Sequence, residues 1–147
     1  MDRREAILAQ LVAVATGIPD FLGVWRNRPM SPSRALRPAC FIFDAHETAL
    51  QVDEPPHARR GLNLVSLRPE IFISLGAAPE DVGPTLNGLR ISLLQAIWAD
   101  ATLASLVTAN GDIRYEGAAT GLTASSGVEA EMGLSLAFFY PLNPAEF

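Results

Sequence analysis

The sequence has no lysine, so its eleven basic residues are all arginine. It has a single cysteine, Cys40, which excludes an intramolecular disulfide; because Cys40 lies in an apolar stretch, we expect an inert core thiol and a reducing compartment. No apolar run approaches the roughly 20 residues of a membrane-spanning helix. The first residues lead into an amphipathic pattern that lacks the features of a signal peptide. These absences predict a soluble, cytoplasmic protein that does not associate with membranes.

The charges are divided unevenly along the chain. Through Arg68, nine arginines oppose seven acids, whereas residues 69–147 hold two arginines and nine acids, a local balance of −7. The net charge of −5 disfavours nucleic acid as a specific ligand. Because arginine is favoured in carboxylate pairs and at protein interfaces, the two halves predict complementary surfaces on neighbouring subunits. A GC-rich genome would equally explain the exclusive use of arginine.

The length and hydrophobic content predict one domain covering residues 1–147. A chain of 147 residues that is 49% hydrophobic buries about two thirds of its unfolded surface, which is enough for a core without disulfides or metals. The sequence contains no internal repeat and no segment with the composition of a domain linker.

The longest regular pattern is the alternation of apolar and other residues over Val128–Tyr140, which is typical of a strand with one buried face. Thirteen residues at roughly 3.3 Å each reach about 43 Å, whereas a globule of this length is about 40 Å across. Such a strand must bend, cross the whole body or project beyond it. A projecting strand normally pairs with another chain, so we interpret the protein as part of an assembly.

Apolar spacing, caps and turn residues predict the other elements. The predicted helices cover Arg3–Thr16, a segment through Trp98 with Glu80 and Asp81 at its positive end and Pro84 in its first turn, and Asp100–Val107. The predicted strands cover Phe21–Asn27, Pro38–Asp44, Val65–Leu75 and Ile113–Ala119, with a turn over Thr120–Gly127. Pro69 interrupts one strand, which places it at an edge, a bulge or a strand start. This order predicts an α+β fold with a mainly antiparallel sheet, helices packed on one face and a long C-terminal β-hairpin. The other face of the sheet, or the hairpin tip, is then the expected working surface.

Two groups of residues are candidates for protein contacts. Tryptophan and arginine dominate interface hot spots, so Trp25 beside its arginines is a candidate anchor, although Trp25 and Trp98 also fit the core. The candidate subunit or tube interface comprises Trp25, Arg26, Arg28, Arg34, Arg37, Arg59 and Arg60. On the hairpin, alternation places four charged residues on the face turned away from the core, where they would cluster and face a partner or a channel. These are Arg114, Glu116, Glu129 and Glu131.

The best enzymatic candidate is a metal site formed by Asp44, His46 and Glu47 just after a predicted strand, with His57 across a loop. The spacing matches no metal-binding motif. Ser125, in a predicted turn, is poorly placed to act as a nucleophile. We therefore expect no catalytic site, no cofactor and no bound metal.

Seven segments, in this order and spacing, carry a resemblance to a known family. They are Val24–Arg28, Pro38–Asp44, Arg68–Ile73, Leu86–Arg90, Asp100–Leu103, Gly111–Gly117 and Phe138–Pro144. The chain resembles the tail terminator proteins of long-tailed bacteriophages and of phage-like particles such as gene transfer agents. The resemblance spans nearly the whole chain.

The resemblance implies a non-enzymatic virion protein of the tail neck, assembled in the cytoplasm of the bacterial host. It implies a hexameric ring that caps the tail tube, stops polymerisation of the tube protein and provides the docking surface for the head-completion protein. DNA would pass through the ring without specific binding, repelled by an acidic hairpin face if that face lined the lumen. The alternatives are another neck component, namely a head-completion or tail-completion subunit, a small metal-dependent hydrolase using Asp44, His46 and Glu47, and a monomeric binding module.

Overall fold

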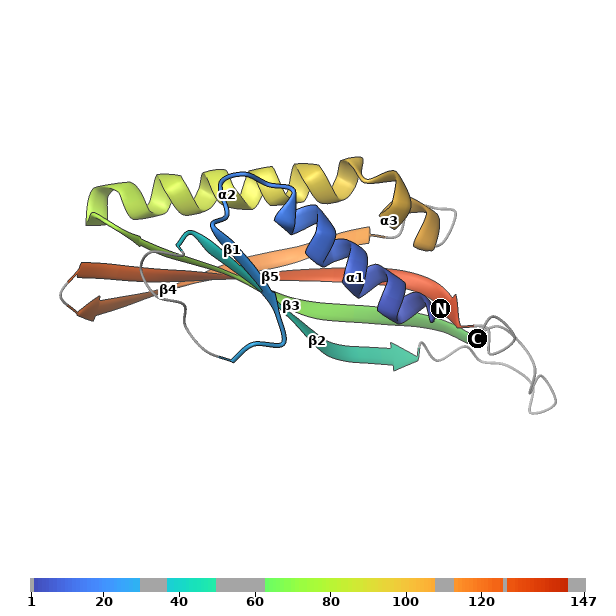
Figure 1. The fold of residues 1–147 in the computed structure, drawn as a ribbon. Coiled ribbons are helices and arrows are strands. Elements are labelled where there is room, and N and C mark those ends of the chain that lie inside the picture. Colours follow the sequence, from blue (N-terminus) through green and yellow to red (C-terminus); the bar gives the residue numbers. More distant parts are fainter. Residues whose placement is uncertain (1, 30–36, 50–62, 108–112, 126, 143–147) are drawn as a thin grey trace.

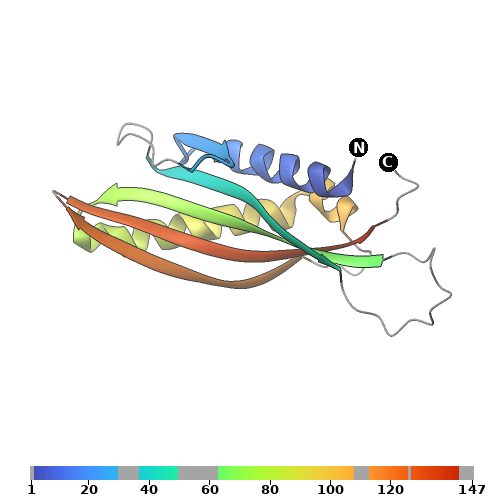
Figure 2. The ribbon, with the colours of Figure 1, turned by 90° about the horizontal axis from the view of Figure 1, so that it is seen from below.

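A computed structural model describes residues 2–29, 37–49, 63–107, 113–125 and 127–142. It confirms the α+β fold: a five-stranded sheet in the order β1-β2-β3-β5-β4, with three helices on one face (Figures 1 and 2). In chain order the elements are α1 (Arg3–Thr16), β1 (Gly23–Arg26), β2 (Ala39–Ala49), β3 (Asn63–Ala77), α2 (Pro79–Ala99), α3 (Ala101–Leu106), β4 (Ile113–Ser125) and β5 (Gly127–Leu142). Only β1 and β2 pair in parallel; the other neighbours are antiparallel.

The long C-terminal strand is confirmed, and it crosses the whole molecule. β5 has 16 residues and pairs with β3 from Leu142 opposite Asn63 to Val128 opposite Ala77. The body is elongated along this strand, and α2 runs beside it (Figure 1). Over the described residues the hairpin does not project as a free arm, so the projection on which we based the assembly interpretation is wrong.

The first helix and the short third helix follow the predicted boundaries because their caps are encoded locally. The Asp100 side chain accepts a hydrogen bond from the backbone N–H of Leu103 at 2.8 Å, which caps α3. α2 begins at Pro79 and has Glu80 and Asp81 in its first turn, as predicted, whereas the prediction of Pro84 in the first turn is wrong, because Pro84 lies inside the helix. Pro84 is exposed, so water can solvate the carbonyl group that its missing N–H leaves unpaired.

Two strands continue well beyond their predicted ends. β2 continues through Ala49 and contains a bulge between Phe43 and His46, opposite Pro69, which confirms the bulge among the three predicted places for that proline. The turn over Thr120–Gly127 is wrong, because β4 continues through Ser125 and pairs with β5 up to the hairpin tip. The small polar residues of this stretch resemble a turn in isolation, but β5 offers their backbone groups a complete ladder of partners.

The core lies between the helices and the face of the sheet that they cover, here called the covered face. It includes the buried side chains of α2 (Val82, Leu86, Leu89, Leu93, Ile97) and of β5 (Ala130, Met132, Leu134, Leu136, Phe138, Tyr140). Neither tryptophan belongs to it, so that prediction is wrong. Trp98 is 49% exposed, and Trp25 is half-buried on the opposite face, here called the open face, which Figure 2 views from below.

Candidate functional site

The open face carries a group of aromatic rings on its first three strands, here called the aromatic face. The register places Trp25 beside Phe41 and Phe41 beside Phe72. Trp25 stacks on Phe41 with ring centroids 5.4 Å apart, and Phe43 meets Phe72 edge-on at 5.8 Å. The guanidinium of Arg28 lies 5.0 Å from the centre of the Trp25 ring. Alternation along three adjacent strands thus brings together residues that are far apart in the sequence.

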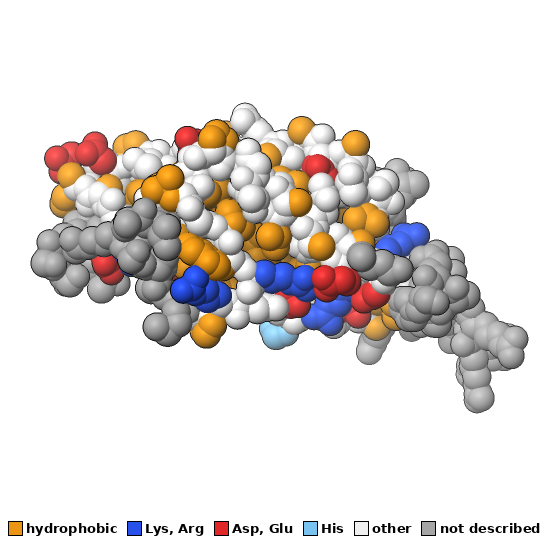
Figure 3. Space-filling view, in the orientation of Figure 1, with side chains coloured by type: hydrophobic (Ala, Val, Ile, Leu, Met, Phe, Trp, Pro, Cys, Tyr) orange, Lys and Arg blue, Asp and Glu red, His pale blue; other side chains and the backbone are white. Residues whose placement is uncertain are grey.

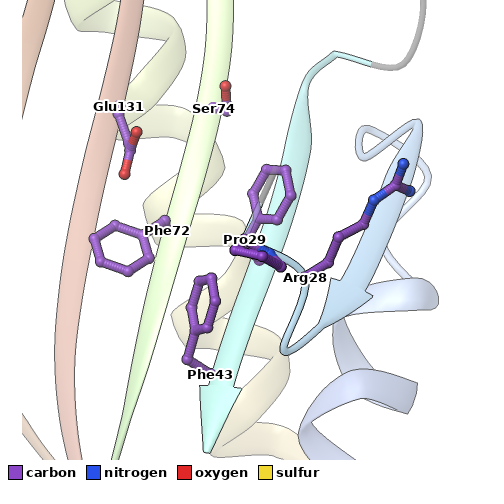
Figure 4. A pocket seen from close by; sticks show the side chains of 7 residues that line it. Arg28, Pro29, Phe43, Phe72, Ser74 and Glu131 are labelled. Atoms are coloured by element: carbon purple, nitrogen blue, oxygen red, sulfur yellow. The ribbon is translucent and has the colours of Figure 1, made fainter. Parts of the chain in front are cut away.

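A pocket of about 150 Å³ opens on this face. Its lining is Arg28, Pro29, Phe41, Phe43, Phe72, Ser74 and Glu131 (Figure 4). Phe72 lies over Gly133 of the neighbouring strand, where an added Cβ would come within 3.2 Å of the ring. The glycine therefore gives the ring its place in the wall of the pocket.

Arg26, a candidate interface residue, is bound within the subunit. Its guanidinium donates to both carboxylate oxygens of Asp44 at 2.8 and 2.9 Å and to both oxygens of Glu5 at 2.7 and 2.8 Å. The hydrogen bonds from Arg26 lower the pKa of the Asp44 and Glu5 carboxyl groups. Arg26 therefore ties α1 to β1 and β2. Figure 3 shows acidic and basic side chains side by side along the lower part of this side of the molecule.

Two further ion pairs join the arginine-bearing half of the chain to the acidic half. Arg37 pairs with Glu129 at 3.0 Å, and Arg68 pairs with Glu116 at 2.8 Å. Much of the charge complementarity that we predicted between neighbouring subunits is thus satisfied inside one subunit.

The four hairpin residues share the open face, as alternation predicts, but they do not form one cluster. Arg114 lies opposite Ala137 near the end of β5, with its guanidinium 4.7 Å from the centre of the Phe139 ring, whereas Glu129 lies near the hairpin tip. The eight-residue separation along β5 corresponds to about 26 Å. Glu131 stands between these ends and makes no ion pair with any residue that the structure describes. Three other candidates, Arg34, Arg59 and Arg60, lie outside the described residues.

The candidate metal site is not assembled. Asp44 and Glu47 point to the covered face, where Asp44 binds Arg26 and the Tyr140 hydroxyl donates to Glu47, whereas His46 pairs with Arg68 in register on the open face. His57 lies outside the described residues, and among those the structure describes no three histidine, cysteine or acidic side chains are grouped to hold a metal. The Cys40 thiol is fully buried, and burial raises its pKa to about 12. This supports the prediction of an inert core thiol.

A second surface lies where α2 ends and the sheet continues. Of the five large hydrophobic side chains that are exposed among the described residues, four lie on α2 and β4. We call these four residues the apolar strip: Tyr115 and Leu122 lie on the covered side of β4, and Ile91 and Trp98 lie on the side of α2 that is turned away from its buried residues. α2 packs over β3 and β5, so β4 presents its core-side residues to solvent. Arg90 connects the two elements by donating a hydrogen bond to the Tyr115 hydroxyl at 3.1 Å.

Tyr115 and Leu122, the β4 members of the apolar strip, lie on an edge strand of the sheet. β4 pairs with β5 on one side and with no described strand on the other, so the backbone groups along its outer side are unpaired. Sequence reasoning missed this surface, although one signal was present. Ile91 and Trp98 fall outside the arc of α2 defined by Leu86, Leu93 and Ile97, and apolar residues outside the buried arc of a helix need another partner.

No known protein family matches the sequence, and comparison with curated proteins gives no match either. Among the residues that the structure describes, no helix has both the length and the apolar character needed to cross a membrane.

Proposed function

We propose that this chain is the subunit of a hexameric ring that caps the tail tube of a phage or phage-like particle, stops tube polymerisation and presents the docking surface for the head. The resemblance of the seven ordered segments selects this function. The structural observation that carries it is the apolar strip beside the unpaired edge of β4, because such a combination on a small subunit favours association with another chain. Within this proposal the protein acts by shape and contact, without catalysis or a cofactor.

A closed ring needs two different surfaces on each subunit, one for each neighbour. The two margins of this sheet differ in this way. One margin has the long β4 edge and the apolar strip, and the other has the four-residue strand β1 with Trp25 and Arg28 beside it. We infer that the β4 margin of one subunit meets the β1 margin of the next, so that the same contact repeats around the ring.

The charge distribution fits a lumen through which DNA slides. Each chain carries −5, so a hexameric ring carries about −30 charges and repels the DNA backbone. Arg37 neutralises Glu129, so on the hairpin near its tip Glu131 is the acid whose charge stays uncompensated among the described residues.

The proposal is tested by deleting the gene in the particle that encodes it and measuring tails by electron microscopy. A terminator deletion yields overlong tail tubes without heads. A lysate with tails of normal length beside unjoined heads would instead identify a head-completion subunit and overturn the proposal. Negative-stain images of the purified protein with isolated tubes provide the direct counterpart, since a terminator adds a ring at one tube end.

A further inference from the structure

We propose that the pocket of the aromatic face binds the guanidinium group of an arginine from a second copy of this chain. That the arginine comes from a second copy rests on the proposed ring. That the pocket binds a guanidinium group is inferred from the residues that line it, and the test of this binding does not depend on ring formation.

The pocket has the size and shape for a planar cation. Its volume of about 150 Å³ matches cavities that accept a benzene molecule, and a guanidinium group is smaller than benzene. The rings of Phe43 and Phe72 form its walls, and the carboxylate of Glu131 stands beside Phe72 (Figure 4). The hydroxyl of Ser74 lies in the same lining.

The chemistry of these walls selects a cation. Aromatic faces attract positive charge, and a carboxylate accepts hydrogen bonds from a guanidinium fork. The arginine in the pocket lining does not meet this need, because the guanidinium of Arg28 is turned away from Phe43 and Phe72 (Figure 4). It lies instead over the Trp25 ring. Glu131 is left without an ion pair among the described residues, at the rim of an aromatic pocket. An anion would be repelled there, and a neutral apolar group would leave the carboxylate unpaired.

Within the subunit, arginines already make both interactions that the pocket would offer, one with an aromatic ring and one with a carboxylate. Three arginines lie over aromatic rings, namely Arg28 over Trp25, Arg90 over Tyr115 at 6.0 Å and Arg114 over Phe139. Another makes the carboxylate fork, because Arg26 donates two hydrogen bonds to Asp44. The chain has no lysine, so arginine is the cationic side chain that a second copy can offer apart from its two histidines. The pocket lies over β2 and β3 and reaches the segment that follows β1, so it opens toward the β1 margin, one of the two margins that meet a neighbour in the proposed ring.

The pocket is tested by titrating the protein with N-acetylarginine amide and following amide and aromatic resonances by NMR. We expect saturable shifts centred on Phe43, Phe72 and Glu131, and none with the neutral analogue N-acetylcitrulline amide at equal ionic strength. Glu131→Gln should weaken binding about tenfold, because it removes a charge-assisted contact. Glu131 is exposed, so this variant keeps the fold. The matched control is Glu70→Gln, an exposed acid on the same face outside this pocket, which should leave binding unchanged.

Equal shifts with the citrulline analogue, or equal affinity in the Glu131→Gln variant, would overturn the pocket assignment. The source is tested separately by sedimentation velocity at increasing protein concentration. Wild-type self-association should decrease when the arginine amide saturates the pocket and in the Glu131→Gln variant. If the pocket binds the arginine amide but the protein stays monomeric at millimolar concentration, a second copy is not the source of the arginine. Neither result alters the tail-length test, which judges the proposed function independently.

Discussion

Replacing Leu122 by alanine tests the contact surface of the proposed ring. Leu122 is 66% exposed on the edge strand, and burying a whole leucine side chain contributes about 1.5 to 3 kcal/mol. If a neighbouring subunit buries the exposed two thirds, truncation weakens each contact by about 1.5 kcal/mol, which is roughly tenfold. A hexameric ring has as many contacts as subunits, so the loss accumulates to about 9 kcal/mol. The protein concentration at which half of the chains are in rings then rises roughly twentyfold.

Sedimentation velocity over a concentration series, with isolated tail tubes present as the assembly surface, measures this shift. The matched control is Thr85→Ala, because Thr85 is exposed on α2 and lies outside the apolar strip and outside both margins of the sheet. Both variants should unfold in urea within about 0.5 kcal/mol of the wild type, as is usual for surface substitutions. An unchanged half-assembly concentration for Leu122→Ala, or an equal increase for Thr85→Ala, would refute the assignment of the strip as a subunit contact.

Three predictions concern the folded subunit. Asp44→Asn should lower the free energy of unfolding by about 1 kcal/mol near neutral pH, because Arg26 holds the pKa of Asp44 below 3.8. This contribution is present above pH 3.8 and is lost as the pH falls through the pKa of the folded state. Urea titrations of the variant and the wild type should therefore differ near neutral pH and show little difference at low pH. Tyr140→Phe should cost about 1 to 3 kcal/mol in the same assay, since it removes the hydroxyl that donates to Glu47, whereas Glu47→Gln, which keeps an acceptor, should cost less. Cys40 should react with a thiol reagent only at the rate of unfolding, because burial raises its pKa to about 12; fast labelling of the native protein would contradict this.

Elements whose boundaries are encoded locally could be predicted from the sequence. The apolar residues of α1 recur at helical spacing, and Gly17 directly follows its last residue, so its range was predicted correctly. The alternation in β5 predicted both a strand and its buried face. The bulge at Pro69 could also be foreseen, because proline lacks the N–H that an uninterrupted ladder would use.

The hairpin tip and the fate of the candidate site residues could not be predicted in this way. Thr120–Ser125 forms a strand only because β5 lies beside it in register. Arg26 was predicted to face a partner, but the fold brings Glu5 and Asp44 to its guanidinium. The aromatic pocket was also missed, since its members come from three strands and from the segment after β1, and no local spacing connects them.

The sequence by itself determined the class of fold, the long C-terminal strand and the buried face of that strand, because these follow from the periodicity of neighbouring residues. The tertiary structure alone decided which charges are paired, which hydrophobic residues remain exposed and where the aromatic rings meet. Arg37 and Glu129 are 92 positions apart, yet their side chains lie 3.0 Å from each other. Such contacts depend on the register and order of strands that are distant along the chain, and pairing between distant segments leaves no periodic trace in either of them.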